Sequence, residues 1–368
     1  MRYTVLEITR QEAPQRRSKC VDLRCVQVIW LLIAPFTVAT ALEVRRSAMR
    51  FQLELEMSSS LPAVALIIPS LTGDVEPLLA GVRRQTLQPA EIAVVRGVRP
   101  NGRARNQGVA RTSAPILVFV DDDARLGDER VLANLVAPLL ADPTIGVTGA
   151  AKLLPPGAGL FQRWAAHEVP RIVHPVVGAP LETNPDPPAF YCEITTTCCA
   201  MRRTVFEQAG GFDETLLRGV DTEFFVRVRR LTARDRGLAT DDGETSPAGA
   251  RARPPTHYRF LLVPHTWVYH PAPATLPALL RKQFLYGAGH AQEVRRDPRR
   301  ARGRALHTPL HAAAFLLFRT AILPLNAVLP YSFAAPSWRP GFKPLKALAS
   351  YASALGYVWG WYVLPDGA

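Results

Sequence analysis

Residues 104–124 read ARNQGVARTSAPILVFVDDDA, and this stretch decides the expected fold. The apolar run 116–120 stands directly before three consecutive carboxylates, Asp121, Asp122 and Asp123. A short apolar run bounded by polar residues predicts a buried strand. Carboxylates that follow a central parallel strand lie where open α/β sheets bind their ligands. We therefore expect the acidic triplet at a ligand-binding edge of a sheet.

Strand and helix signals alternate around this stretch. Apolar runs predict strands at 64–68, 92–95, 116–120 and 145–148, and helical patterns follow at 75–82, 102–112 and 131–139. Asp74 and Asp128 are expected to cap the first and third of these helices. Alternating strands and helices with short loops predict a mostly parallel sheet covered by helices on both faces, so the predicted fold class is α/β.

The second half of this domain is less regular. Residues 151–190 are rich in proline and poor in periodic runs, and residues 233–256 form a polar stretch that we interpret as an insertion. Helices are predicted at 202–208 and 221–231, and a strand pair at 258–263 and 266–269. The catalytic domain is thus expected to span residues 58–275.

The N-terminal extension, residues 1–57, differs from the rest. A basic start leads into an uncharged run of apolar character at 26–42, which is at the short end for a membrane span. Three interpretations remain open: a signal anchor, an interfacial helix, or translated sequence upstream of a start at Met49 or Met57.

The C-terminal tail, residues 276–368, combines basic and hydrophobic segments. Eight basic residues face two acidic ones between Arg281 and Arg304, and hydrophobic stretches follow at 306–333 and 347–364. The second stretch carries aromatic residues near its end and is a candidate span. The first is either a re-entrant or surface-lying helix or a full crossing, and both stretches could instead pack on a soluble domain. The basic residues predict a cell-membrane location with the catalytic domain on the cytoplasmic side.

Composition narrows the function classes. The 368 residues, 48% of them hydrophobic, suit one catalytic domain with a tail. A net charge of +13 suits nucleic acid, anionic lipid or a phosphorylated substrate, but no zinc finger, helix-turn-helix or RNP motif is present, so we expect no nucleic-acid partner. Five cysteines without a CxxC spacing indicate neither a zinc site nor a disulfide framework and favour a reducing compartment.

The acidic triplet suggests a metal. Three adjacent carboxylates repel one another, and a hard divalent cation relieves that repulsion through its oxygen ligands. Mg²⁺ in particular often bridges carboxylates to substrate phosphates. The sequence therefore predicts a divalent cation beside this triplet that contacts a phosphorylated substrate.

Four motifs in a fixed order resemble the family 2 glycosyltransferases. The stretch 104–124 resembles their nucleotide-sugar segment, with the acidic triplet at the DxD motif. GGFDETLLRGVDTEFFVRVRRL at 210–231 resembles their acceptor segment, and VALIIPS at 64–70 their first strand. VYHP at 268–271, followed by RKQFLYGAG at 281–289, resembles the stretch that closes the domain. The similarity covers about residues 62–290.

The resemblance implies a GT-A fold, with a Rossmann-like sheet, and inverting transfer from a nucleotide-diphosphate sugar with Mg²⁺ or Mn²⁺. It implies that Asp123 and Asp121 bind the metal, that His270 completes or flanks that site, and that Asp221 is the general base. For Asp221 a helix N-cap is the alternative role. The positions matching the nucleotide-sugar site are Pro69, Ser70, Arg96, Arg105, Asn106, Asp121 and Asp122.

Two positions depart from the family pattern. Arg96 stands where the family commonly has an Asp that contacts the nucleotide base, and Val220 stands where it has Glu. The donor base is therefore open, and Arg96, together with Arg103 and Arg105, either meets phosphates or faces solvent. Glu223 is a candidate for a supporting role. The acceptor is lipid-linked or a saccharide in cell-envelope glycan or glycolipid synthesis, and a non-catalytic, membrane-bound binding module remains the alternative.

Overall fold

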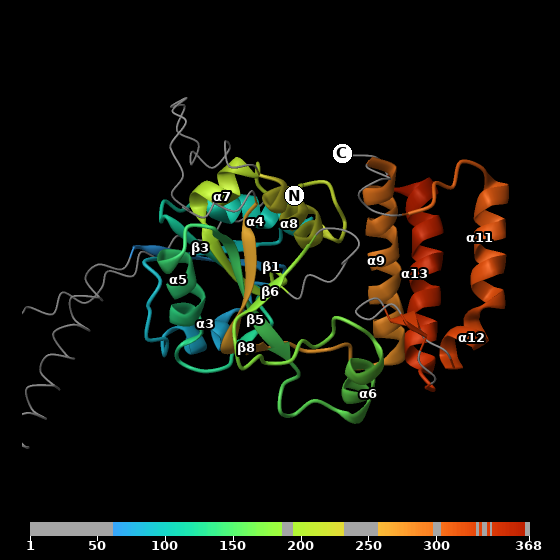
Figure 1. Cartoon of the computed structure of the whole chain (residues 1–368), viewed down its shortest axis with the longest axis horizontal. Coiled ribbons are helices and arrows are strands. Elements are labelled where there is room, and N and C mark those ends of the chain that lie inside the picture. Colours follow the sequence, from blue (N-terminus) through green and yellow to red (C-terminus); the bar gives the residue numbers. More distant parts are fainter. Residues whose placement is uncertain are drawn as a thin grey trace, which may run out of the picture. The chain divides into compact units, whose positions relative to one another are not determined.

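The computed structural model describes residues 62–185, 194–231, 257–296, 303–328, 331–332, 337–338 and 341–364 (Figure 1). The described residues from Val64 onward belong to one compact unit, and a second unit, Arg10–Ala63, falls almost entirely outside them. The predicted extension 1–57, with its apolar run 26–42, and the predicted insertion 233–256 lie outside the described residues.

Eight of the described strands build one sheet. The strands are β1 (Val64–Ser70), β2 (Glu91–Arg96), β3 (Ile116–Val120), β4 (Arg125–Leu126), β5 (Ile145–Leu153), β6 (Leu181–Thr183), β7 (Cys198–Arg202) and β8 (Arg259–Tyr269). Their order is β2-β1-β3-β7-β5-β8-β4, and β6 also pairs with β8. Because β7 is antiparallel to both β3 and β5, the strands β1, β2, β3, β5 and β8 all run in one direction. The predicted fold class, α/β with a mostly parallel sheet, is confirmed.

Helices cover both faces of this sheet, as the alternating pattern predicted (Figure 1). One face packs against α4 (Asn101–Ala110), α7 (Arg203–Gln208) and α8 (Val220–Arg230). The other packs against α3 (Glu76–Val82) and α5 (Val131–Ala141). Each helix supplies its apolar side to a hydrophobic core of its own face.

The central strand β3 divides its side chains between the two cores. Leu117 and Phe119 enter the core beneath α4, α7 and α8, whereas Ile116, Val118 and Val120 enter the core beneath α3 and α5. All five are buried, which explains why the strand is a continuous apolar run rather than an alternating one. This burial fixes where the strand ends, and therefore where the acidic triplet begins.

Three sequence predictions are wrong in detail. The strand pair at 258–263 and 266–269 is one strand, β8, which is irregular where His265 has a φ of 50° and where its register with β5 shifts. Asp74 and Asp128 cap no helix, because the N-caps are Val75 and Arg130. Asp128 instead accepts a hydrogen bond from the Arg130 N–H at 2.9 Å. The proline-rich stretch after β5 also contains a helix, α6 (Leu160–Glu168).

The tail is helical. It contains α9 (Leu276–Arg296), α11 (Pro309–Ala321), α12 (Leu323–Val328) and α13 (Pro344–Val363), with a short antiparallel pair formed by β9 (Tyr331–Ser332) and β10 (Ser337–Trp338). Within the described ranges no helix is both long and apolar enough to cross a membrane, and the candidate span 347–364 falls in α13.

Glycines let α9 and α13 approach closely. A Cβ added to Gly356 would lie 1.9 Å from the carbonyl oxygen of Phe284, and one added to Gly287 would lie 1.9 Å from that of Ser353. The tail is also tied to α6, because the buried Glu168 carboxylate accepts the N–H of Leu345 at 2.7 Å, in the first turn of α13. That carboxylate satisfies a backbone donor that the helix itself leaves unpaired.

Candidate active site

The shared direction of five strands brings polar residues to one edge of the sheet. Ser70 and Arg96 end β1 and β2, Asp121 follows β3, Lys152 lies at the end of β5, and His270 follows β8. The carboxyl ends of parallel strands meet at the same edge, which is where α/β sheets bind ligands. The sequence prediction that the acidic triplet lies at such an edge is thus reproduced in the structure.

Asp121 is held by a buried cation. The Arg105 guanidinium of α4 donates to Asp121 Oδ1 at 2.8 Å and lies over the Phe212 ring. The side chain of Arg105 is only 4% exposed, and the Asp121 N–H donates to the Thr197 carbonyl at 3.1 Å. Arg105, predicted to bind the nucleotide sugar, therefore fixes the first carboxylate of the triplet in place.

Asp123 lies beside His270 because of strand pairing. The two residues of β4 run antiparallel to the end of β8, with Arg125 opposite Tyr269. This register places Asp123, just before β4, next to His270, just after β8, with Asp123 Oδ1 and His270 Nε2 3.3 Å apart. One ligand atom each of Asp121, Asp123 and His270 lies within 4.8 Å of the others.

The electrostatics of this cluster suit a cation. Burial, and then the charges of Asp121 and Asp122, raise the pKa of Asp123 to about 6. Burial lowers the pKa of His270 well below its usual value, so its imidazole is neutral at physiological pH. A neutral imidazole and repelling carboxylates gain from a divalent cation, and the two oxygens and one nitrogen are donors that Mn²⁺ and Mg²⁺ accept. The predicted metal ligands Asp121, Asp123 and His270 are thus together and fit such an ion.

Two lysines that the sequence analysis missed lie in the same electrostatic environment. Lys282 of α9 lowers the pKa of Asp123 and also that of His270. Lys152 is buried, donates to the Arg171 carbonyl at 2.8 Å, and has its pKa lowered to about 8 by burial and then by Lys282. In the sequence, Lys152 directly follows the mostly apolar stretch 145–151. The strand there was predicted to end at 148, whereas β5 continues to Leu153 and includes Lys152. Lys282 has no comparable signal, because only the packing of α9 brings it here.

Asp221 opens α8 without capping it. The N-cap is Gly219, with a φ of 79°, and the helix begins at Val220, so the N-cap role left open for Asp221 is wrong. Asp221 Oδ1 accepts the Thr222 N–H at 2.9 Å. Asp221 and Asp121 both raise the pKa of Lys152, so the two carboxylates act on the same side chain.

Helix α9 braces the segment that leads to Asp221. The Leu217 N–H donates to Gln292 Oε1 at 2.9 Å, and Arg296 forms an ion pair with Asp213. Gly219 lies against Glu293 of the same helix. The tail helix therefore holds the loop before α8, and with it the carboxylate of Asp221.

The remaining predicted nucleotide-sugar residues divide into two groups. Pro69 and Ser70 end β1 next to Arg96, and the Ser70 hydroxyl accepts the Gly73 N–H at 2.8 Å. The Nε of Arg96 is buried and has no hydrogen-bond partner. Asn106, in contrast, uses both ends of its amide on the Phe212 backbone, at 2.8 and 2.9 Å. Asn106 thus braces the GGFDE segment against α4.

The last candidate residues from the sequence are Asp122, Arg103 and Glu223. Asp122 is half-buried next to Asp121 and contributes to the raised pKa of Asp123. The exposed Arg103 approaches Glu214 at 3.9 Å. Glu223, considered for a supporting role, pairs with Arg227 at 2.7 Å within α8. Its carboxylate is therefore already occupied by an ion pair.

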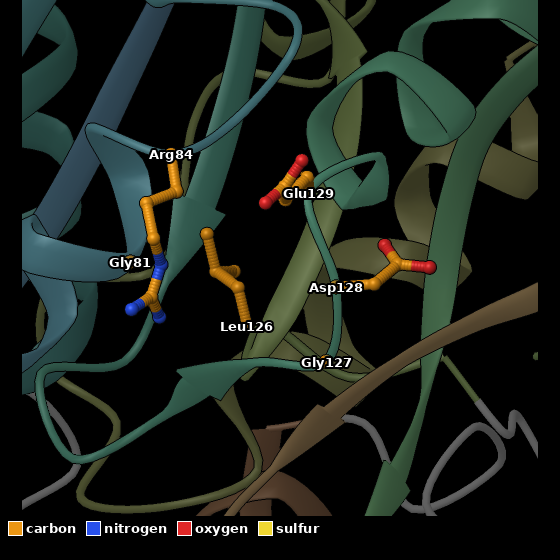
Figure 2. A pocket seen from close by; sticks show the side chains of 6 residues that line it. All are labelled: Gly81, Arg84, Leu126, Gly127, Asp128 and Glu129. Atoms are coloured by element: carbon orange, nitrogen blue, oxygen red, sulfur yellow. The ribbon is translucent and has the colours of Figure 1, made fainter.

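A cavity of about 200 Å³ lies apart from this cluster (Figure 2). Its lining residues are Gly81, Arg84, Leu126, Gly127, Asp128 and Glu129. None of the residues predicted for catalysis, metal binding or nucleotide-sugar binding is among them. We therefore identify the sheet edge, and not this cavity, as the candidate active site.

Known proteins similar to this chain include glycosyltransferases. No protein-family model matches. The O-antigen biosynthesis protein RfbC of Myxococcus xanthus is 28% identical over 131 residues, which are 33% of this chain and 10% of that protein. The chain thus spans about a tenth of the length of the curated relative it matches.

Three solved structures illustrate the structural likeness. The mannosyltransferase PcManGT of Pyrobaculum calidifontis, in complex with GDP-Man and Mn²⁺, has a TM-score of 0.46 and 16% identity, covering 82% of this chain and 88% of that one. GalNAc-T7 with UDP, GalNAc and Mn²⁺ has a TM-score of 0.38 and 15% identity, covering 69% and 54%. S. aureus TarS has a TM-score of 0.38 and 13% identity, covering 81% and 55%. All three TM-scores are below 0.5 and all three identities are 16% or lower, so the assignment of function rests on the site itself.

Proposed function

We propose that this protein is an inverting, metal-dependent glycosyltransferase that moves a sugar from a nucleotide-diphosphate donor to an acceptor hydroxyl or phosphate. The observation that carries the proposal is the Asp121–Asp123–His270 cluster, located at the carboxyl edge of the sheet and linked electrostatically to Asp221 through Lys152. The order of sequence motifs similar to family 2 enzymes supports it independently. By analogy with the proteins it resembles, the donor is a nucleoside diphosphate sugar and the ion Mg²⁺ or Mn²⁺.

The residues divide the chemistry between them. Asp121, Asp123 and His270 hold the cation, which when bound supplies positive charge that offsets the charge of the departing diphosphate. Lys282 and Arg96 add positive charge and a hydrogen-bond donor at the same edge, where phosphates are favoured. We assign Pro69, Ser70 and Asp122 to the surroundings of the donor.

Asp221 serves as the general base in this proposal. Its Oδ1 already accepts the Thr222 N–H, so Oδ2 takes the proton from the acceptor. As that proton leaves, the acceptor oxygen forms a bond to the anomeric carbon on the face opposite the diphosphate. The bond between that carbon and the diphosphate oxygen breaks, the electron pair leaves with the nucleoside diphosphate, and the configuration inverts.

We place the reaction at the cytoplasmic side of the cell membrane and assign its product to cell-envelope glycan or glycolipid synthesis. The basic and hydrophobic tail supports the membrane location, and the similarity of a short segment to an O-antigen biosynthesis protein supports the envelope role. The acceptor in this proposal is lipid-linked or a saccharide.

Paired substitutions separate the two halves of the site. Asp221→Asn should keep Mn²⁺-dependent binding of a nucleoside diphosphate, measured by calorimetry, while transfer falls by about 10³-fold, because the general base is lost. Asp123→Ala should lose the metal-dependent part of binding. Asp128→Asn, in the separate cavity, is the matched control and should behave as the wild type. Full transfer activity in both Asp221→Asn and Asp123→Ala would refute the assignment.

A second candidate function is a binding module that has lost catalysis. Val220 and Arg96, at the two positions that depart from the family pattern, motivate it. A screen of nucleotide sugars with membrane extract, following release of nucleoside diphosphate, distinguishes the two. Metal-dependent binding without release from any donor would favour the binding module.

A further inference from the structure

An apolar face runs along the exposed side of α11, and exposed apolar residues follow in α12. The exposed residues on this side are Leu310, Ala313, Ala314, Leu317, Phe318, Ala321, Leu325 and Val328, and we call them the α11–α12 face. Leu310, Leu317 and Phe318 are 76%, 72% and 60% exposed. The spacing of three and four residues from Leu310 to Ala321 makes one continuous stripe on α11, and Leu325 and Val328 are exposed on α12. Soluble helices turn such a stripe to a core, so its exposure here marks an interaction surface.

The exposed polar residues of α11, His311 and Thr320, fall at the edges of this face. Arg319, which is the charged residue of α11, donates to the Ser350 carbonyl at 3.0 Å and so points toward α13. The inner side of α11 packs through Ala312 and Phe315 against Tyr357. One side of α11 therefore packs toward α13, and the other side is the α11–α12 face. No Asp, Glu, Lys or Arg side chain lies in that face.

The charge of the surrounding segment identifies the class of partner. Between residues 298 and 365 the sequence contains no Asp or Glu but eight Arg and Lys. A second copy of this chain would bring the same positive charge to the contact and be repelled. An anionic surface is attracted instead, and an apolar helix face combined with basic flanks is what an interfacial helix uses to bind anionic lipid.

Basic and aromatic groups gather where α11 begins. The Tyr362 hydroxyl donates to the Leu306 carbonyl at 2.7 Å, and its ring is 47% exposed. Arg295 donates to the Trp361 carbonyl, which brings the basic end of α9 to the same place, and Arg304 is exposed beside it. Tyrosine and tryptophan rings favour the boundary between headgroups and acyl chains.

We propose that the α11–α12 face lies in the plane of one leaflet of an anionic membrane and attaches the enzyme there without crossing it. This inference specifies how the proposed membrane location is achieved, and it does not depend on the transfer chemistry. The apolar side chains enter the boundary between headgroups and acyl chains, and the basic residues meet the lipid phosphates. The occupant of the face is a lipid surface.

The test is flotation of the full chain with vesicles, in the absence of donor and acceptor. One set of vesicles is phosphatidylcholine alone, and the other contains phosphatidylglycerol as well. The double variant Leu317→Gln/Phe318→Gln removes the centre of the face at strongly exposed positions, so the fold should tolerate it. Leu160→Gln, at an 86% exposed position of α6, is the matched control for a lost surface hydrophobe.

We expect the wild type and Leu160→Gln to float with the anionic vesicles, and the double variant to bind them at least about tenfold more weakly, because two large apolar side chains no longer leave water. Hydrogen exchange should show vesicle-induced protection within 309–328 in the wild type alone. Equal binding by the double variant and the wild type would overturn the proposal. So would equal binding to both kinds of vesicle, or a double variant that changes only the oligomeric state.

Discussion

The carboxylate of Asp123 and the imidazole of His270 lie 3.3 Å apart although one follows β3 and the other follows β8. Their proximity results from the pairing of Arg125 with Tyr269 in a strand of only two residues. A metal site at this edge therefore depends on a short antiparallel strand at the end of a mostly parallel sheet.

Asp123→Asn should stabilise the metal-free protein near neutral pH. The pKa of Asp123 rises from 3.8 to about 6 on folding, because the carboxyl is partly desolvated and lies beside the charges of Asp121 and Asp122. The folded state thus binds a proton more tightly than the unfolded state, so stability is full below about pH 4 and falls as the pH rises through about 6. Asn carries no charge, so Asp123→Asn removes this loss of stability at higher pH. Because half of the Asp123 side chain is exposed, we expect the substitution to raise the free energy of unfolding in urea by less than about 1.5 kcal/mol.

The same variant should lose the stabilisation that Mn²⁺ gives to the wild type. Thermal unfolding with and without the ion, near pH 7 and near pH 4, measures both effects. The substitution should make a much smaller difference to the metal-free protein near pH 4, where Asp123 is protonated in the folded state and only partly ionised in the unfolded state. A metal-free Asp123→Asn protein that is less stable than the wild type near pH 7 would contradict this account of the carboxyl.

Arg105→Met should destabilise the protein and disturb the metal site together. Arg105 is the buried partner of Asp121, and its removal leaves that carboxylate beside Asp122 and Asp123 without its ion pair. Breaking a buried ion pair in this way costs about 3 kcal/mol. Arg83→Met breaks the ion pair with Glu76, in which both side chains are exposed, and should change the free energy of unfolding much less. Equal unfolding free energies for the two variants, in urea, would show that the Arg105 pair contributes little.

The parallel half of the fold was predictable because its strands are continuous apolar runs. β3 is buried on both faces, and such strands leave a clear signal. β7 was missed because Cys198–Arg202 consists mostly of small or weakly strand-forming residues, and its antiparallel insertion between β3 and β5 depends on tertiary pairing. β4 has only two residues and leaves no pattern at all.

The candidate site likewise combines residues that were predictable from the sequence with residues that only the folded chain brings together. The sequence indicated the acidic triplet because it directly follows an apolar strand, and the resemblance added His270 and Asp221. Lys282 was not predictable, because α9 is a tail helix whose position relative to the sheet no local pattern specifies. Asn106 matched a family position, yet its amide braces Phe212, a contact that only the folded chain shows.

Gly219→Ala should destabilise the protein more than Gly97→Ala does. Both glycines have positive φ, of 79° and 68°, so both alanines carry about 1–2 kcal/mol of backbone strain. At Gly97 an added Cβ meets nothing within 4 Å, whereas at Gly219 it would lie 2.1 Å from Glu293 Oε1. Glu293 must then move, and with it the contact that positions Asp221.

In a Glu293→Ala background, the additional loss caused by Gly219→Ala should equal that of Gly97→Ala in the wild type, because only the backbone strain remains. Unfolding free energies in urea provide the comparison, and transfer kinetics should show kcat falling in Gly219→Ala. If Gly219→Ala and Gly97→Ala were equally stable, the contact between this loop and α9 would contribute nothing to stability.

Gly356→Ala should weaken transfer from a distance. The added Cβ would lie 1.9 Å from the Phe284 carbonyl oxygen, so α13 and α9 must separate. The same α9 supplies Gln292 to the loop before Asp221, and a displaced helix withdraws that support. We expect lower thermal stability and a several-fold lower kcat with an unchanged affinity for Mn²⁺, since Asp121, Asp123 and His270 lie on the sheet. Gly341→Ala, with nothing within 4 Å of the added Cβ, is the control and should leave all three quantities unchanged. A normal kcat in a destabilised Gly356→Ala protein would show that the tail stabilises the fold without positioning the base.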